Sequence, residues 1–338
     1  MLGPRSSFDA LVTWCRALRH GHGAGLPLVR VFETQARNGP TALREAAARI
    51  ARKLRAGDTL QDALTAEGPN LPELFVSLAV VGEQTGRMPE VFGHLEEYYR
   101  LQSQLRREFR AQAAWPVFQF IAAVVVIALT IFILGLLAPD SPTAPIGFGL
   151  TGTSGAILFL VVVGSVVGGM LLAYKLATAT VDKQASFEAW VLRLPVAGPA
   201  FHAAAMSRFC LALRLTLDSA LPVARALRLS LRATDNAAFQ AQADRIAKRV
   251  GKGEEVANAI GTNPIFPAEF LATLSLGEIS GQIPEVMAKQ AEYYREETAR
   301  RMKALTRALG WGVYGIVGVF IIVAIFRMAG VYIQALGG

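Results

Sequence analysis

Few side chains in this sequence are spaced for catalysis or metal binding. His20 precedes the glycine-rich stretch 21–25 and His22 lies within it; the two could ligate a metal, but further ligands at metal-binding spacing are missing. We interpret that stretch as a turn between helices. Cys15 and Cys210 fall on apolar helix faces, which is typical of reduced core thiols. The sequence has no P-loop pattern. We therefore predict no catalytic, metal or cofactor site, and no enzyme.

The sharpest local feature is a ten-residue motif, Gly-Glu-x-[Thr/Ser]-Gly-x-x-Pro-Glu-Val, which occurs at 82–91 and again at 277–286. Its second glycine is predicted to end one helix, and its proline to open the next. Its second glutamate would then lie in a helix first turn, where the helix dipole favours an acid. The first glutamate precedes the turn and has no such role. The motif is thus either a structural turn or a contact with a partner or another domain, and the candidate contact residues are Glu83, Gly86, Pro89, Glu90, Glu278, Gly281, Pro284 and Glu285.

The motif belongs to a longer internal repeat, in which equivalent positions differ by 195 in residue number. From Gly82 to Arg100, ten of nineteen positions are identical to the segment from Gly277 to Arg295. The same offset pairs Cys15 with Cys210, Leu26-Pro27 with Leu221-Pro222, and Pro72 with Pro267, with a one-residue shift near Gly57 and Gly253. We predict two copies of one small helical bundle, each with about six helices. Phe8, Leu11, Val12, Cys15 and Leu18 would share one buried helix face.

Three uncharged apolar runs suggest that the chain crosses a membrane. They cover 117–138, 155–174 and 309–326. The first has 22 residues, which as a helix span about 33 Å, enough for a hydrocarbon core of about 30 Å. The runs account for much of the 53% apolar composition, which excludes a disordered chain.

The net charge of +8 predicts the topology of the chain rather than a nucleic-acid partner. Of the 34 Lys and Arg residues, all but Arg327 lie before the first run or between the second and the third. The loop 139–154 contains none. Because basic residues near span ends stay cytoplasmic, both copies are predicted inside the cell and the C-terminus outside. Basic residues are interspersed with acids and form no aromatic-basic platform, so we expect no nucleic-acid binding.

We therefore predict an all-α integral membrane protein with two repeated cytoplasmic helical-bundle domains and three transmembrane helices. The expected segments are a cytoplasmic domain at 1–115, transmembrane helices at 116–138, 155–175 and 309–332, a periplasmic loop at 139–154, a second cytoplasmic domain at 176–308, and a periplasmic tail at 333–338. The two copies each lead into a span in the same direction, which requires a return helix such as the one predicted at 155–175.

With its duplicated domains, three spans and paired Gly-Glu-x-x-Gly elements, the sequence resembles the type II secretion F / type IV pilus assembly inner-membrane platform family from about Phe8 to Val331. Trp115-Pro116 resembles the aromatic-proline pair of the family, although its offset partner, Gly310-Trp311, lacks the proline. The resemblance implies a non-enzymatic scaffold that couples a cytoplasmic hexameric assembly ATPase to the polymerisation of pilins or pseudopilins. Other inner-membrane subunits, membrane lipid and further copies of the chain are implied as partners.

Two other classes of function remain open at the level of the sequence. A transporter or channel subunit without catalytic activity would need polar groups within its spans, and the predicted spans contain no Asp, Glu, Lys or His apart from terminal positions. A membrane-anchored enzyme would need a catalytic constellation, which we do not find. The sequence does not distinguish protein secretion, pilus extension and DNA uptake.

Overall fold

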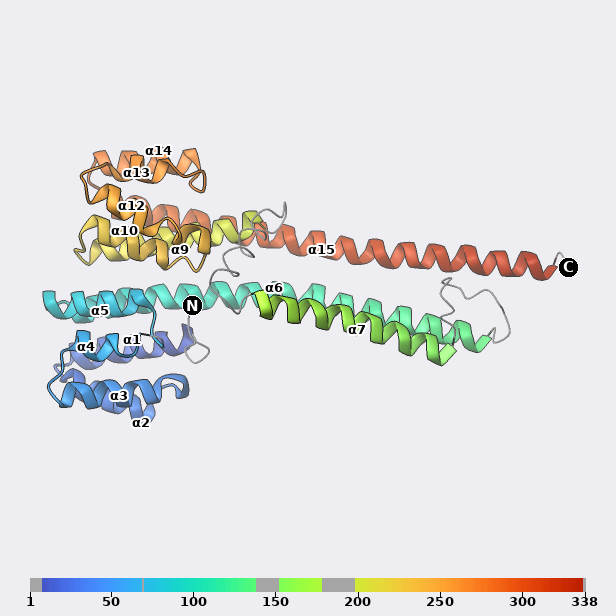
Figure 1. Ribbon diagram of the computed structural model, residues 1–338, viewed down its shortest axis with the longest axis horizontal. Helices are drawn as coiled ribbons and strands as arrows, with labels where there is room; N and C mark the ends of the chain where they lie inside the picture. Colours follow the sequence, from blue (N-terminus) through green and yellow to red (C-terminus); the bar gives the residue numbers. More distant parts are fainter. Residues whose placement is uncertain (1–7, 69, 138–151, 178–197, 337–338) are drawn as a thin grey trace. The chain divides into compact units, whose positions relative to one another are not determined.

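The computed structural model of the chain describes residues 8–68, 70–137, 152–177 and 198–336, and these residues form helices joined by turns (Figure 1). The first copy of the repeat contains α1 (Phe8–Gly23), α2 (Leu28–Asn38), the short 3-10 helix η1 (Thr41–Leu43), α3 (Arg44–Arg55), α4 (Leu60–Thr65), α5 (Glu73–Thr85) and the start of α6 (Met88–Leu137). After α7 (Gly152–Ala177), the second copy contains α9 (Gly198–Asp218), α10 (Val223–Arg232), α11 (Ala237–Gln240), α12 (Ala243–Val250), α13 (Val256–Gly261), α14 (Ala268–Ile279) and the start of α15 (Ile283–Leu336).

The chain divides into two compact units. The first unit combines Met1–Glu108 with Glu188–Ala299, and the second combines Phe109–Phe187 with Arg300–Gly338. Within the first unit we call residues 8–108 copy 1 and residues 198–299 copy 2. The helices α6 and α15 each begin in the first unit and end in the second.

The local sequence explains why copy 1 folds into helices. Leu11, Cys15 and Leu18 of α1 are buried, and Phe8 and Val12 are partly buried, so the predicted apolar face of this helix is confirmed. Alanines and long straight side chains make up most of α3, and both favour helix. The chain turns after α3 at Gly57, whose φ of +95° is a left-handed conformation that glycine adopts without strain.

The structure repeats with the offset that the sequence predicts. The starts of α2, α5 and α6 are separated from the starts of α10, α14 and α15 by that same offset. The start of α4, at Leu60, and the start of α13, at Val256, are separated by one residue more. Gly57 and Gly253, which follow α3 and α12 and both have positive φ, are also separated by one residue more than the offset, so the shift begins before these turns and ends before α5 and α14. The two copies therefore share one order of helices, and the one-residue shift is confirmed.

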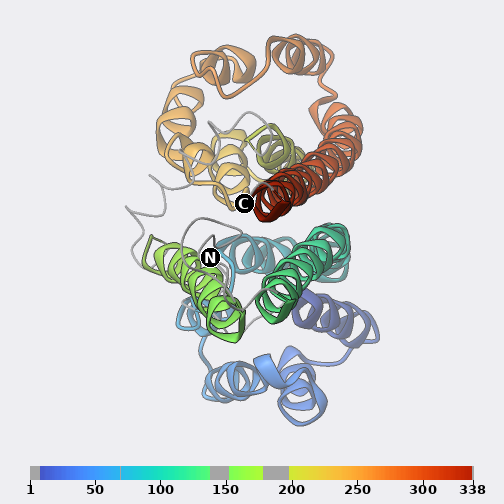
Figure 2. The same cartoon turned by 90° about the vertical axis from the view of Figure 1, so that its right-hand side faces the viewer.

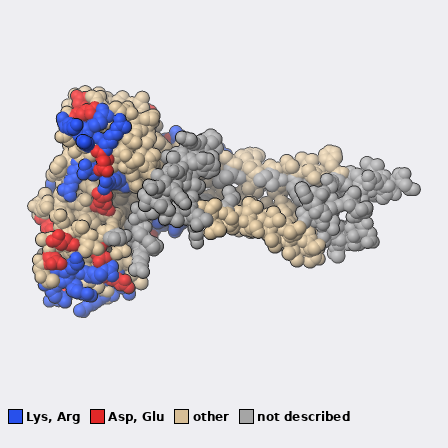
Figure 3. All heavy atoms as spheres, viewed as in Figure 1, with Lys and Arg blue, Asp and Glu red and all other residues tan. Residues whose placement is uncertain are grey.

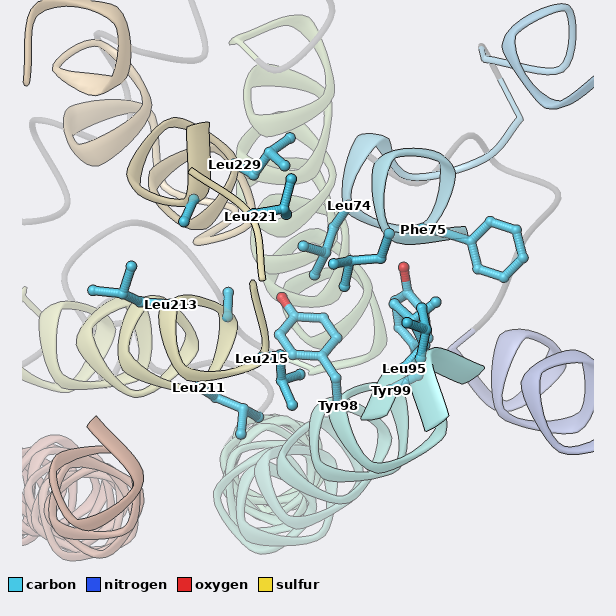
Figure 4. Packing of buried hydrophobic residues seen from close by; sticks show 14 of the residues in the cluster. Leu74, Phe75, Leu95, Tyr98, Tyr99, Leu211, Leu213, Leu215, Leu221 and Leu229 are labelled. Carbon is cyan, nitrogen blue, oxygen red and sulfur yellow. The ribbon is translucent and has the colours of Figure 1, made fainter. Parts of the chain in front are cut away.

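Copy 1 and copy 2 share a buried contact inside the first unit. Leu74 of α5 and Tyr98 of α6 point toward leucines of copy 2: Leu215 of α9, Leu221 of the α9–α10 turn and Leu229 of α10 (Figure 4). At the polar edges of this contact, the Tyr98 hydroxyl donates to the Ala233 carbonyl over 3.1 Å. Arg232 pairs there with Glu73 over 3.1 Å and with Asp244 over 3.1 Å. The apolar leucines thus fill the centre of the contact, and the ion pairs lie at its exposed edge.

In the second unit, long apolar helices lie side by side. Figures 1 and 2 show α7 running alongside α6. Among the described residues, two segments are long and apolar enough to cross a membrane by length and composition, Met88–Ile133 in α6 and Ile283–Val323 in α15. The described part of α7 contains a shorter apolar segment, Thr153–Gly169. All three membrane crossings therefore stay predictions, and the one at 155–175 has the shorter apolar segment.

The helix ends differ in detail from the predicted segments. α6 runs without interruption from the first unit through Pro116, and α15 continues to Leu336, past the predicted end at 332. Most of the predicted loop 139–154, the start of the predicted second domain at 178–197 and the last two residues of the tail lie outside the described residues.

Candidate functional site

Both copies of the Gly-Glu motif form the same helix-ending turn. In copy 1, Gly86 has a φ of +70°, its N–H donates to the Glu83 carbonyl over 3.2 Å, and the Arg87 N–H donates to the Gly82 carbonyl over 2.9 Å. In copy 2, Gly281 has a φ of +68°, and the equivalent bonds measure 3.2 and 2.8 Å. This paired bonding is the Schellman arrangement, in which a left-handed glycine satisfies the last carbonyls of a helix. The predicted turn is confirmed.

The first glycine of the motif allows its helix to approach the next one closely. A Cβ at Gly82 would lie 3.2 Å from Val91 and 3.1 Å from the Met88 sulfur. A Cβ at Gly277 would lie 2.9 Å from a methyl carbon of Val286. The first glycine and the last valine of the motif are therefore packing partners across the turn, and any larger residue at the glycine would push the two helices apart.

The prolines and the second glutamates occupy the positions that the sequence predicted for them. Pro89 and Pro284 are the second residues of α6 and α15, where a missing N–H costs nothing. Glu90 and Glu285 lie in the first turns of these helices and are exposed. Glu90 also accepts a hydrogen bond from the Nε of Arg87 over 2.7 Å.

The first glutamates differ between the copies. The carboxylate of Glu278 accepts the backbone N–H groups of Val256 and Ala257, over 2.6 and 3.0 Å. These two groups belong to the first turn of α13, whose N-terminal residue Glu255 provides no side-chain cap. Glu278 therefore caps a neighbouring helix, a role that its position before the turn did not reveal, because the two helices meet only in the folded bundle.

In copy 1 the equivalent helix has its own cap, and this leaves Glu83 free. Thr59, at the N-terminus of α4, accepts the Asp62 N–H on its hydroxyl over 3.1 Å. Among the described residues, the carboxylate of Glu83 has no hydrogen-bond or ion-pair partner, and the residue is exposed. Partial desolvation raises the pKa of this carboxyl above its ordinary value. Of the eight predicted contact residues, Glu83 is thus a carboxylate without a structural role in its own copy.

The cysteines are buried, and the first two histidines lie at the end of a helix. Cys15 and Cys210 are fully buried, and burial raises the pKa of both thiols. His20 and His22 lie in the last turn of α1. Within the described residues no group of three or more His, Cys, Asp or Glu side chains is placed to hold a metal ion.

The charged surface of the first unit contains one feature that the sequence did not single out. A shallow cavity of about 420 Å³ in copy 1 is lined by Arg49, Arg52, Lys53, Ala66, Glu67 and Asn70. Glu67 is nearly fully buried there and binds Arg49 through two hydrogen bonds of 2.6 and 2.9 Å. This ion pair holds the pKa of Glu67 below its usual range. Figure 3 shows blue basic side chains gathered on the helical bundles, whereas the described surface of the apolar helices is tan.

The fold and the motif define a class of duplicated all-helical proteins in which each copy continues into a long apolar helix. The sequence model of the family described as "Type II secretion system (T2SS), protein F" matches residues 14–135 and again 209–329. The starts of the two matches are separated by the offset of the repeat, and together the matches cover more than half of the chain. The chain belongs to this family.

Named relatives agree with this assignment. The chain is 25% identical over 314 residues to the type IV pilus assembly protein PilC of Pseudomonas aeruginosa, covering 88% of this chain and 82% of that protein. It is 24% identical over 268 residues to the type II secretion system protein F of the same species, covering 74% and 64%. The PilC protein of Thermus thermophilus is 23% identical over 314 residues, covering 88% and 76%.

Proposed function

We propose that this chain is the inner-membrane platform protein of a type II secretion or type IV pilus assembly machine. It acts as a homo-oligomeric scaffold that couples a cytoplasmic hexameric ATPase to the polymerisation of pilins or pseudopilins, without catalysing a reaction itself. The observation that carries this proposal is the duplicated match to the protein F family, with each copy leading directly into a long apolar helix.

The surface of the long helices supports their placement in a membrane. Large apolar side chains on α6 and α15 are exposed, including Phe118, Val125, Ile322 and Phe326. Such a surface is unfavourable in water, where it would bring apolar helices together, but is compatible with lipid. Arg106, Arg107 and Arg110 before the first run, and Arg300, Arg301, Lys303 and Arg307 before the third, would flank these spans on the cytoplasmic side.

A thiol-labelling experiment tests the proposed topology. Thr153, at the start of α7, is exposed and belongs to the predicted periplasmic side, whereas Asp58 in the α3–α4 turn belongs to the cytoplasmic side. A membrane-impermeant maleimide should label Thr153→Cys in intact spheroplasts and Asp58→Cys only after lysis. The native thiols are buried and need no replacement. Labelling of Asp58→Cys in intact cells would reverse the orientation and remove the proposed contact with a cytoplasmic ATPase.

Within this function, Glu83 is the proposed contact for a basic surface of the ATPase. It is exposed and unpaired, and its carboxyl is not needed to cap α4. The variant Glu83→Lys should reduce ATPase co-purification with the full-length chain at least tenfold. The matched control Asp58→Lys makes the same charge change at another exposed site of copy 1. If both variants retained the ATPase equally, Glu83 would not be the contact.

A further inference from the structure

The internal contact between copy 1 and copy 2 uses a different face of each copy. Copy 1 contributes its α5 face, made of Glu73, Leu74 and Tyr98. Copy 2 contributes its α10 face, made of Leu221, Leu229, Arg232 and the Ala233 carbonyl. Because the copies are repeats, each face has an equivalent on the other copy. The contact is therefore heterologous, and among the described residues one face of each kind remains without a partner.

The first of these unpartnered faces lies on α14 and α15, and we call it the α14 face (Glu269, Leu276, Ile279 and Tyr293). Leu276 is 69% exposed where its copy-1 equivalent Val81 is 6% exposed, and Tyr293 is 45% exposed where Tyr98 is 4% exposed. Ile279, one turn beyond Leu276, is 82% exposed. Large apolar side chains at these levels of exposure indicate a surface that another protein covers.

The tyrosines show that the α14 face keeps the geometry of the α5 face. Tyr293 meets Tyr294 edge-on with ring centroids 5.2 Å apart, as Tyr98 meets Tyr99 at 5.2 Å. The Tyr98 hydroxyl donates to the Ala233 carbonyl, whereas the Tyr293 hydroxyl has no acceptor among the described residues. Tyr98 and Tyr293 therefore meet their neighbouring tyrosines in the same way, but Tyr293 has no hydrogen-bond acceptor among the described residues.

The second unpartnered face lies on copy 1, and we call it the α2 face (Leu26, Thr34, Arg37 and Asn38). Leu26 is 50% exposed where its equivalent Leu221 is 5% exposed. Arg37 is exposed and makes no ion pair within 4.0 Å among the described residues, whereas its equivalent Arg232 bridges Glu73 and Asp244. Asn38 occupies the position of Ala233, whose carbonyl accepts the tyrosine hydroxyl in the internal contact.

We propose that the α14 face of one chain binds the α2 face of a second copy of the same chain. The charges agree with this pairing, because the exposed Glu269, which takes the place of Leu74 and follows the equivalent of Glu73 by one position, would bring an acid close to the unpaired Arg37. Thr34 replaces the buried Leu229 of the α10 face, so the contact between chains is more polar than the internal one. Because the pairing is heterologous, it propagates into a ring or an open row of chains.

This inference rests on the proposed function, since it specifies how a homo-oligomeric platform would assemble. The experiment co-expresses two differently tagged full-length chains in native membranes, one carrying Asn38→Cys and the other Tyr293→Cys. A short bis-maleimide should join the two tags into one covalent species. Chains that each carry both substitutions should form a ladder of dimers and higher species. Peptide mass spectrometry of Tyr98→Cys/Ala233→Cys provides the internal control.

Charge variants identify the apolar centre of the contact. Adding Ile279→Glu to the doubly substituted chain should reduce the ladder at least fivefold, because it places a carboxylate in an apolar surface. Gln84→Glu places a carboxylate at the equivalent exposed position of copy 1 and should leave the ladder unchanged. Ile279 is exposed, and continued protection of the buried native thiols would confirm that the variant folds.

Three results would overturn the proposal. These are the absence of cross-links between chains while the internal control reacts, dimers formed by Tyr293→Cys chains alone, and a ladder that Ile279→Glu does not reduce. Dimers of Tyr293→Cys alone would indicate a two-fold symmetric contact instead. Normal ATPase co-purification in a protein that does not cross-link would reject this contact and leave the platform function standing. Cross-linking between chains without ATPase co-purification would reject the platform function and leave the contact standing.

Discussion

The substitution Glu278→Ala should destabilise the protein, while the equivalent substitution Glu83→Ala should not. Glu278 is the only side chain in the described structure that accepts the backbone N–H groups of Val256 and Ala257 at the start of α13. Removing its carboxylate leaves two donors of a helix first turn without a protein acceptor. Glu83 accepts no hydrogen bond among the described residues, because Thr59 caps the equivalent helix.

The magnitude follows from the number and exposure of these hydrogen bonds. Loss of a helix cap costs about 0.5–2 kcal/mol, and a hydrogen bond to a charged group contributes about 1.5–3 kcal/mol when it is well shielded. Glu278 is only half-buried, so water replaces part of the loss and we expect about 1–2 kcal/mol. Each kcal/mol lowers the Tm of a unit of about 220 residues by roughly 2–4 °C. Glu83→Ala should change stability by less than about 0.5 kcal/mol.

The assay is thermal unfolding of the full-length chain in one detergent at one scan rate, compared across variants. A second substitution provides a rescue. In the background of Glu278→Ala, Glu255→Thr places a local cap at the start of α13, as Thr59 does for α4, and should recover most of the lost Tm. The reasoning would be wrong if Glu83→Ala lowered the Tm as much as Glu278→Ala, or if the rescue had no effect.

Three further predictions concern packing, pH and the contact between the copies. Gly277→Ala should lower stability by about 1–3 kcal/mol, because its Cβ would lie 2.9 Å from Val286. The control Gly261→Ala, whose Cβ makes ordinary contacts, should not lower stability, and the unfolding midpoints of the two variants are compared. Arg49→Met should destabilise the protein at pH 7 by about 1–3 kcal/mol, since it removes the ion pair of the buried Glu67 carboxylate and leaves only the hydrogen bond from Asn70. The paired state lowers the pKa of Glu67, so this stabilisation is present above the unfolded pKa of about 4.3 and is lost as the pH falls through the lower folded pKa. The difference in unfolding free energy between wild type and Arg49→Met should therefore be smaller at pH 4 than at pH 7. Tyr98→Phe should lower the Tm by roughly 1–4 °C through loss of the bond to Ala233, whereas Tyr293→Phe should leave the Tm unchanged.

Much of the fold follows from the sequence, because the repeat and the turn chemistry are local. Gly86 and Gly281 have left-handed conformations at the helix ends, and the offset of the repeat recurs in the starts of α5 and α14. These features depend on backbone conformation and helix period, which neighbouring residues determine.

The different roles of Glu83 and Glu278 could not be predicted in the same way. Both glutamates occupy one position of one motif, yet Glu278 finds its hydrogen bonds on a helix that comes earlier in the chain. The signal that separates them lies at the N-terminus of that helix, where copy 1 has Thr59 and copy 2 has Glu255. A threonine there indicates a local cap, and its replacement by glutamate suggests that the cap comes from elsewhere.

The contact between the copies also required the structure. Leu74 and Glu269 are equivalent in the repeat, but only the folded chain shows that the leucine lies against the other copy and the glutamate remains exposed. Tertiary packing between distant segments leaves no periodic signal in the sequence.

We propose above all that the chain is a platform required for pilin or pseudopilin assembly. The most direct test is to delete its gene in the host cell and to measure assembled filament by shearing and immunoblotting, with a plasmid-borne copy as the control. Loss of filament, retention of unassembled pilin in the inner membrane and recovery with the plasmid are the predicted results. Wild-type levels of filament in the deletion strain would contradict the claim.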